Sequence, residues 1–420
     1  MKLNNAQQAA VTHIYDYGET YLIGPMGSGK TGVGLHAVDE LLRDKHIKRV
    51  LVVAPLRVCN EVWQIEPARW GLSRLNVVCA TGSVSQRARA LTGSANVVCI
   101  NFEKLAWLFT ETALWQTFDM LIIDEGTKIK SGSVGFKALR KHLHQFKVRL
   151  LMTGTPVSED FTGLFYQVMA VDDGRTFGKN KQNWLDRYFY STDYKQYNWE
   201  VSPHRVTALI KAFKQLVVVL PEYTDELPPL NEIPVIVPDC RTPEYDELVG
   251  SMQTGNVTAA NAAVLVGKLQ QAASGFLYDD DGKTQQLHDA KHVHQVNTDQ
   301  TPLIVVYQFQ EELRRLQQWF PRAYTVDQLD NWRLSRDGVL LMHPRSAGHG
   351  LDLTHSHTMI FMSPVWSRDL TRQTIARIWR RGQTSPCSVY TLCGDDTIDM
   401  EIVDREHYKA GYHEVLLSHL

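Results

Sequence analysis

Short runs of apolar residues recur along the first part of the chain. Their residues are nearly all apolar, whereas a strand with one exposed face would alternate with polar residues, so they predict strands buried on both faces of a parallel sheet. The connections between them are long enough to hold crossover helices, which parallel strands require. The pattern predicts an α/β fold, with strands at 20–24, 50–55, 76–80, 96–101, 118–124 and 148–154.

A different pattern follows, and the strand pattern then returns. Aromatic and charged residues predominate after residue 161, up to the proline-rich stretch "LPEYTDELPPLNEIP". Residues 243–275 read as helix closed by Gly275. Apolar runs recur at 302–309, 338–344, 357–364 and 387–393. We therefore expect a first lobe over 1–165, a helical insertion and connection over 166–230, and a second lobe over 231–420, helical at 240–298 with its core at 301–420.

Composition changes this picture little. With 44% hydrophobic and 21% charged residues and a formal charge of −2, the 420-residue chain has the makeup of a globular protein of two domains. Contact with nucleic acid would have to come from local basic patches. The six cysteines show no metal-binding spacing and predict buried free thiols. Neither a signal peptide nor a run of about 18 apolar residues is present, so we expect a cytoplasmic protein with no membrane partner.

The stretch "GPMGSGKT" at residues 24–31 fits the phosphate-binding loop pattern G-x-x-x-x-G-K-[ST]. An apolar strand runs into it and a helical pattern, "TGVGLHAVDELLRD", runs out of it. Glycines let backbone N–H groups approach phosphates, and the helix N-terminus adds positive potential. Lys30 is expected to reach the β- and γ-phosphates and Thr31 to hold Mg²⁺, with phosphate contacts from Gly27, Ser28 and Gly29.

A second stretch, "FDMLIIDEGT" at 118–127, ends a buried strand in two carboxylates. Ligands bind α/β sheets at the carboxyl ends of their strands. Asp124 is expected to hold Mg²⁺, and Glu125 to orient or deprotonate the attacking water. Together with the phosphate loop, this pair predicts nucleotide hydrolysis.

Far along the chain, "QTIARIWRRGQ" at 373–383 carries four arginines. Wound as a helix, it places Gln373, Arg377 and Arg380 on one face, and an apolar group of Ile375, Ile378 and Trp379 on the other. The apolar face would attach the helix to the second lobe, and the first face would be free to contact phosphate.

These motifs, in this order, resemble helicase superfamily two, and within it the Swi/Snf-like DNA translocases, especially compact phage or bacterial members. The resemblance rests on "LNNAQQAAV", "GPMGSGKT", "DEGTKIKS", "LLMTGTP", "SAGHGLDLT" and "RQTIARIWRRGQ". It implies two RecA-like lobes with ATP between them. Gln7 would read adenine, Gly350 and Asp352 would contact the nucleotide, and Arg377 and Arg380 would stabilise charge on the transferring phosphoryl.

The resemblance also implies roles for two further groups of residues. Residues coupling hydrolysis to lobe movement would be Thr127, Thr153, Gly154, Thr155 and Gln373. Contacts to nucleic acid, mainly to phosphates and independent of sequence, would come from Pro55, Arg57, Asn101, Lys104, Lys128, Lys130, Ser346 and Trp366. Three features depart from the family pattern: Thr127 stands in place of histidine, Asp352 stands in place of asparagine, and "GPMGSGKT" lacks the acidic residues that commonly precede Met-Gly.

The function implied is an ATP hydrolase that uses ATP and Mg²⁺ to move on, or remodel, duplex or branched DNA, acting as a monomer. Branch migration, annealing and displacement of bound proteins are examples of such remodelling. One alternative is a helicase that acts on RNA or separates DNA strands. Another is a clamp that grips DNA under nucleotide control without useful turnover, although the presence of Glu125, Arg377 and Arg380 argues against it.

Overall fold

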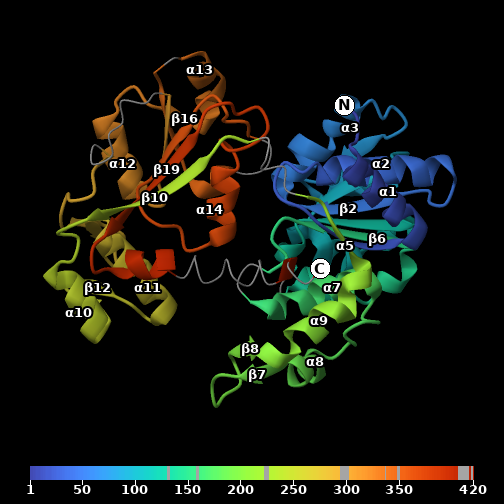
Figure 1. The fold of residues 1–420 in the computed structure, drawn as a ribbon, viewed down its shortest axis with the longest axis horizontal. Helices are drawn as coiled ribbons and strands as arrows, with labels where there is room; N and C mark the ends of the chain where they lie inside the picture. The colour runs from blue at the N-terminus through green and yellow to red at the C-terminus, as the bar shows by residue number, and fades with distance from the viewer. Residues whose placement is uncertain are drawn as a thin grey trace. The chain divides into compact units, whose positions relative to one another are not determined.

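The computed structural model describes residues 1–129, 133–157, 160–221, 227–293, 302–335, 337–347, 351–404, 416–417 and 420. The chain divides into two compact units (Figure 1). Unit 1 comprises residues 1–223 together with 409–420, and unit 2 comprises residues 224–408. Each unit is built on its own parallel sheet flanked by helices, which confirms the expected α/β class with two RecA-like lobes.

Unit 1 contains a seven-stranded sheet in the order β3-β4-β2-β5-β6-β1-β9, with every pair of neighbours parallel. The six strands expected from the apolar runs are all present. The strands are β1 (Glu19–Ile23), β2 (Val50–Ala54), β3 (Val77–Cys79), β4 (Val97–Asn101), β5 (Met120–Asp124), β6 (Val148–Thr153) and β9 (Val217–Val219). The seventh strand, β9, places a part of the expected 166–230 insertion in the sheet of unit 1, beside β1.

Helices cover both faces of this sheet (Figure 1). Along β2, Leu51 and Val53 belong to one apolar cluster, and Val50 and Val52 to another, so alternate residues face opposite layers. This two-sided burial is the reason the strands read as continuous apolar runs. The helices are α1 (Asn5–Tyr17), α2 (Lys30–Arg43), α3 (Glu66–Trp70), α4 (Val84–Thr92), α5 (Leu105–Glu111), α6 (Val134–Leu139), α7 (Leu164–Asp172), α8 (Lys181–Tyr188) and α9 (Val206–Phe213).

Unit 2 contains a six-stranded parallel sheet in the order β10-β19-β18-β15-β17-β16. Its four expected strands are present, together with β10 and β16, which the apolar runs did not mark. The proline-rich connection thus ends in β10, an edge strand, where Pro234 is tolerated because one side needs no ladder hydrogen bond. The strands are β10 (Leu230–Val237), β15 (Leu303–Val306), β16 (Tyr324–Thr325), β17 (Val339–Met342), β18 (Thr358–Phe361) and β19 (Cys387–Gly394).

The helix expected over 243–275 is interrupted. Met252 and Gly255 have positive φ angles, and residues 253–258 form a two-stranded ribbon between two helices. A second ribbon encloses the expected "DDDG" turn. The elements are α10 (Pro243–Ser251), β11 (Gln253–Thr254), β12 (Val257–Thr258), α11 (Ala262–Ala273), β13 (Phe276–Tyr278), β14 (Thr284–Gln286), α12 (Gln310–Trp319), α13 (Leu329–Leu334) and α14 (Arg368–Ile375).

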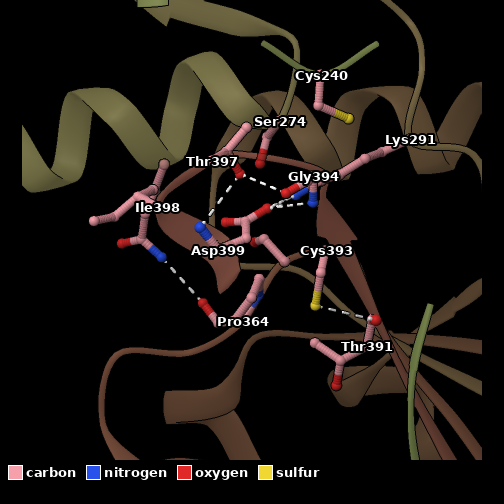
Figure 2. A network of polar contacts seen from close by, with 12 residues as sticks. Cys240, Ser274, Lys291, Pro364, Thr391, Cys393, Gly394, Thr397, Ile398 and Asp399 are labelled. Carbon is pink, nitrogen blue, oxygen red and sulfur yellow. Dashed lines mark hydrogen bonds and ion pairs between the residues drawn. The ribbon is translucent and has the colours of Figure 1, made fainter. Parts of the chain in front are cut away.

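A buried ion pair joins two segments of unit 2 that are distant in sequence (Figure 2). Lys291 Nζ donates to Asp399 Oδ2, and both side chains are almost fully buried. The same carboxylate oxygen accepts the N–H of Gly394 at 2.9 Å, and Thr397 Oγ1 donates to the Gly394 carbonyl at 2.8 Å. These contacts hold residue 291 at the end of β19. Removing one partner of the ion pair would leave an uncompensated buried charge, which is strongly destabilising.

The sequence raised three expectations, on membrane-spanning segments, metal-binding groups and cysteines, that bear on the residues the structure describes. Within them, no helix has both the length and the apolar character needed to cross a bilayer. The same ranges contain no group of three or more histidine, cysteine or acidic side chains placed to bind a metal ion. All six cysteines are free thiols, as expected; five are buried and Cys79 is half-buried.

Candidate nucleotide and nucleic-acid site

The loop between β1 and α2 has the conformation that phosphate binding needs. Gly27 and Gly29 have φ angles of +79° and +81°, which favour glycine. A Cβ atom on Gly29 would also lie 2.4 Å from Nε2 of Gln7, so a larger residue would have to displace that amide. Helix α2 begins at Lys30, directly after the loop, and its first N–H groups face the loop region.

Lys30 lies against this loop. Its Nζ donates to the carbonyl oxygens of Gly24 at 2.5 Å and Pro25 at 2.9 Å. Burial lowers the pKa of Lys30, and the nearby charges of Glu125 and Asp124 oppose that change. Buried Ser28 Oγ has no hydrogen-bond partner. Among the described residues, the hydrogen bonds of this lysine go to neutral carbonyls, and the Ser28 hydroxyl makes none, so phosphate oxygens could engage both groups.

Gln7 is packed onto the loop. It closes a capping box at the start of α1, accepting the N–H of Asn4 at 3.0 Å. Its Nε2 donates to the carbonyl oxygen of Ser28 at 2.8 Å. Both ends of the amide are therefore engaged in fixing the loop, while its expected role in reading adenine stays a prediction.

The two carboxylates at the end of β5 have distinct environments. The indole N–H of buried Trp63 donates to Asp124 Oδ2 at 2.9 Å. Glu125 is almost buried and has a φ angle of +73°, an unfavourable backbone conformation for a residue with a side chain. Thr127 Oγ1 donates to Glu125 Oε1 at 2.9 Å. Thr127, which stands where the resembling family has histidine, thus donates a hydrogen bond to the expected catalytic carboxylate.

Residues at the end of β6 complete the group. The N–H of Gly24 donates to the carbonyl oxygen of Thr153 at 3.1 Å. A Cβ atom on Gly154 would lie 3.8 Å from Lys30 Nζ, so that backbone passes close to the lysine. The N–H of Thr155 donates to Thr153 Oγ1 at 3.2 Å. Because β5, β6 and β1 are neighbours, their carboxyl ends bring these motifs to one edge of the sheet.

Several expected nucleic-acid contacts follow neighbouring strands on the same edge. Pro55 and exposed Arg57 follow β2, Lys104 follows β4, and exposed Lys128 follows β5, and these three strands are adjacent in the sheet. Asn101 is buried: its Nδ2 donates to Glu103 at 2.6 Å, and its Oδ1 has no partner. Lys130 lies outside the described residues.

In unit 2, the expected helix over 373–383 is wrong. Helix α14 ends at Ile375, and Arg377 and Arg380 lie in the turns that follow. The carbonyl oxygen of Arg377 accepts the N–H of Leu353, and that of Ile378 accepts Nε2 of Gln383. In a longer helix those carbonyls would accept the N–H groups of residues 381 and 382, so the helical ladder does not continue there.

The apolar group of this segment nevertheless packs as expected, with Ile375 and Ile378 in the core of unit 2 and Trp379 against it. Arg377 is only 6% exposed, and its Nε has no hydrogen-bond partner. Burial, together with the charge of Arg380, lowers the pKa of Arg377 to about 10. No carboxylate among the described residues forms an ion pair with this buried cation.

The remaining expected residues of unit 2 lie around this segment. Arg380 Nη1 donates to the Leu351 carbonyl at 3.2 Å, and Gln373 is half-buried in α14. Exposed Asp352 accepts the N–H and hydroxyl of Thr354, and Ser346 Oγ donates to the His343 carbonyl at 2.7 Å. Trp366 is 37% exposed. Gly350 lies outside the described residues.

Trp63 is the site residue that reasoning from sequence missed. It is fully buried in a short π-helical segment, Val58–Trp63, that follows β2, and it contacts Asp124 through its indole N–H. The residue stands 61 positions before that aspartate and belongs to no phosphate-binding motif. The sequence offers one signal for Trp63: it is a tryptophan that closely follows β2, a strand that comes before β5, the strand that ends in Asp124.

The chain is similar in sequence to one protein family and to several known proteins. Residues 18–218 match the SNF2-related domain. A putative protein, p41, of Acyrthosiphon pisum secondary endosymbiont phage 1 is 29% identical over 450 residues, covering 98% of this chain and 97% of that protein. The DNA repair and recombination protein RDH54 of Saccharomyces cerevisiae is 23% identical over 88% of this chain, and RAD54-like of Drosophila pseudoobscura pseudoobscura is 21% identical over 94%.

The chain spans only part of the two eukaryotic relatives, 46% of the yeast protein and 60% of the fly protein. Among solved structures, a Sulfolobus solfataricus SWI2/SNF2 ATPase core in complex with dsDNA is similar with a TM-score of 0.49 at 16% identity, covering 99% of this chain and 95% of that one. The matched residues 18–218 include the phosphate loop, Asp124, Glu125 and the residues after β6. Residues 18–218 of this chain are therefore similar to an SNF2-related domain.

Proposed function

We propose that this chain is an ATP-driven motor that moves on, or remodels, duplex or branched DNA. The observation that carries the proposal is the group formed by the phosphate loop, Asp124, Glu125 and Gly154 at one edge of the sheet, within an SNF2-related domain. A loop that binds phosphates beside two carboxylates is suited to hydrolysis of a nucleoside triphosphate.

The residues present fit ATP and Mg²⁺. The unpartnered hydroxyl of Ser28 and the Cβ-free positions of the loop leave polar capacity and room for phosphate oxygens. Asp124 and Thr31 would hold Mg²⁺, which would neutralise charge on the phosphates. Lys30 would exchange two carbonyl acceptors for phosphate oxygens, a stronger, charge-assisted interaction.

Glu125 would act on the attacking water. Its carboxylate is almost buried and accepts the hydroxyl of Thr127, and it would orient the water and accept its proton. The positive φ angle at Glu125 fixes the direction in which the side chain leaves the strand. Thr127 would thus position the catalytic carboxylate where the family has histidine.

Among the described residues of unit 2, Arg377 is the one best suited to contact a phosphate group. A guanidinium that is 6% exposed and has no carboxylate partner among the described residues is costly to bury, and an anion would offset that cost. We therefore retain Arg377, with Arg380 beside it, as the residues that stabilise charge during turnover.

DNA is the proposed substrate for two reasons. The eukaryotic relatives are named for DNA repair and recombination, and Arg57, Lys104 and Lys128 follow neighbouring strands at the edge that carries the phosphate loop. Contacts of that kind bind phosphates without reading sequence. Branched DNA, action as a monomer and a cytoplasmic location are finer parts of the same proposal.

The test is ATP turnover measured without nucleic acid, with blunt duplex, with forked or four-way branched DNA, and with RNA. We expect duplex or branched DNA to stimulate turnover, and Lys30→Ala to abolish it. Lys147→Ala is the matched control, because Lys147 is an exposed lysine beside the amino end of β6. Stimulation by RNA alone would favour the RNA helicase, and nucleotide-dependent DNA binding without turnover would favour the clamp.

A further inference from the structure

A small hairpin of unit 1 exposes an unusual number of aromatic side chains. Strands β7 (Phe189–Ser191) and β8 (Trp199–Val201) pair antiparallel and are joined by residues 192–198. Figure 1 shows the hairpin extending beyond α8 and α9. Tyr194 is 103% exposed, Tyr197 is 80% exposed and Tyr190 is 45% exposed. Single exposed aromatic residues are common on protein surfaces, but three exposed tyrosines within eight residues of one hairpin indicate a binding surface.

The tip of this hairpin is a built structure. The carboxylate of Asp193 accepts the N–H groups of Asn198 at 2.7 Å and Tyr197 at 3.2 Å, and these bonds hold the pKa of Asp193 below its usual range. The indole N–H of Trp199 donates to the carbonyl oxygen of Gln196 at 2.8 Å. Because these contacts order the loop beforehand, a ligand that binds the tyrosines pays little ordering entropy.

The hairpin is also fixed to the body of unit 1. Phe189 is buried, with its ring centroid 4.6 Å from that of Trp184 in α8. The N–H of Ser202 donates to the carbonyl oxygen of Tyr188 at 3.0 Å. The tyrosines at the tip therefore keep a defined position relative to α8 and α9.

Exposed charges in the sequence segment that contains the hairpin, residues 179–214, are mostly positive. Between residues 179 and 214, the exposed acidic residues are Asp186 and Glu200. The exposed basic residues in the same range are Lys179, Arg187, Lys195, Arg205, Lys211 and Lys214. This excess of cations occurs in a chain whose formal charge is −2, so the region has the charge of a surface that meets an anion.

We propose that this hairpin binds unpaired nucleotides, with bases stacking on Tyr194 and Tyr197 and phosphates contacting Lys195 at the tip and Arg187 and Arg205 near the base. Aromatic platforms beside a basic surface are the combination by which proteins hold single strands. An acidic protein surface would account for the cations but not for two rings with free faces. The inference goes beyond the proposed motor function, because movement along duplex DNA needs no contact with unpaired bases.

The experiment compares Tyr194→Ala/Tyr197→Ala with the matched variant Tyr194→Phe/Tyr197→Phe, which keeps both rings. Fluorescence anisotropy would measure binding of full-length protein to single-stranded DNA, to RNA of the same sequence and to a blunt duplex. We expect the alanine variant to lose about tenfold or more in affinity for single strands, with duplex affinity within about twofold, and the phenylalanine variant to bind normally. If the alanine variant loses affinity for both single-stranded DNA and RNA, the hairpin binds unpaired nucleotides of either kind. If it loses affinity for DNA alone, the ligand is single-stranded DNA.

Single-strand affinity that is unchanged in the alanine variant would overturn the proposal and leave the hairpin to a protein partner. Equal losses on duplex and single strands would overturn it as well. A second variant, Lys195→Ala, should reduce the dependence of single-strand affinity on salt by about one phosphate contact. Lys30→Ala should retain single-strand binding, so failure of the motor proposal and failure of this one are separable.

Discussion

Replacing Trp63 with phenylalanine tests how Asp124 is positioned. The change removes the indole N–H that donates to Asp124 Oδ2 at 2.9 Å, while a phenyl ring keeps much of the buried volume. A hydrogen bond to a charged group contributes about 1.5–3 kcal/mol. Because 1.4 kcal/mol is a factor of ten, the expected loss is about 10- to 140-fold in apparent Mg²⁺ affinity or in ATP turnover.

The assay is ATP turnover as a function of Mg²⁺ concentration, with ATP binding measured in parallel. Trp332→Phe is the matched control: Trp332 is also fully buried, but its indole N–H donates to the neutral carbonyl oxygen of Gly338 at 3.0 Å in unit 2. Both variants lose core volume, but only Trp63→Phe removes a hydrogen bond to Asp124. Only Trp63→Phe should therefore raise the Mg²⁺ concentration needed for turnover. Identical Mg²⁺ profiles for the two variants would refute the reasoning that Trp63 orients Asp124.

Three further changes follow from contacts already described. Thr127→Val removes the donor to Glu125 and should lower kcat about tenfold while the Kd for ATP stays unchanged; normal kcat would contradict the positioning role. Asp399→Ala should reduce the free energy of unfolding by about 3–5 kcal/mol in urea, whereas Lys291→Met with Asp399→Leu should recover much of it. His288 donates through Nε2 to the Ala272 carbonyl and accepts at Nδ1, and burial lowers its pKa from 6.5. Its contribution to stability is complete above pH 6.5 and is lost as pH falls through the folded-state pKa, so His288→Gln should flatten the pH dependence of unfolding below pH 6.5, and an unchanged slope would contradict this.

Much of the fold could be predicted because its strands are buried on both faces. Along β2, every residue from Val50 to Ala54 is buried, so the strand reads as a continuous apolar run. The phosphate loop could be predicted because glycine, lysine and threonine are each required by local geometry. By contrast, β7 and β8 are only three residues long, with one buried side chain in β7 and none in β8, so no periodicity marks them.

The rest depends on contacts between residues distant in sequence. A helix continuing after residue 375 could not be ruled out locally, because Leu353, which donates to the carbonyl oxygen of Arg377, is distant in sequence. Gln7 resembles an adenine-reading residue in sequence, yet its contact with Ser28 depends on how α1 packs beside the loop. Partners of this kind are set by tertiary packing, which overrides local preference.

The parallel pairing of β10 with β19 has a consequence for synthesis on the ribosome. Leu230 pairs with Cys387, which is made 157 residues later. At about 5–20 residues per second, β10 waits roughly 8–30 s for its partner. During that interval it is an unpaired strand, and Glu232 and Pro234 are residues of the kind that discourage pairing with a neighbouring nascent chain. The composition of this strand therefore suits the time before the protein is folded as well as its place at the edge of the finished sheet.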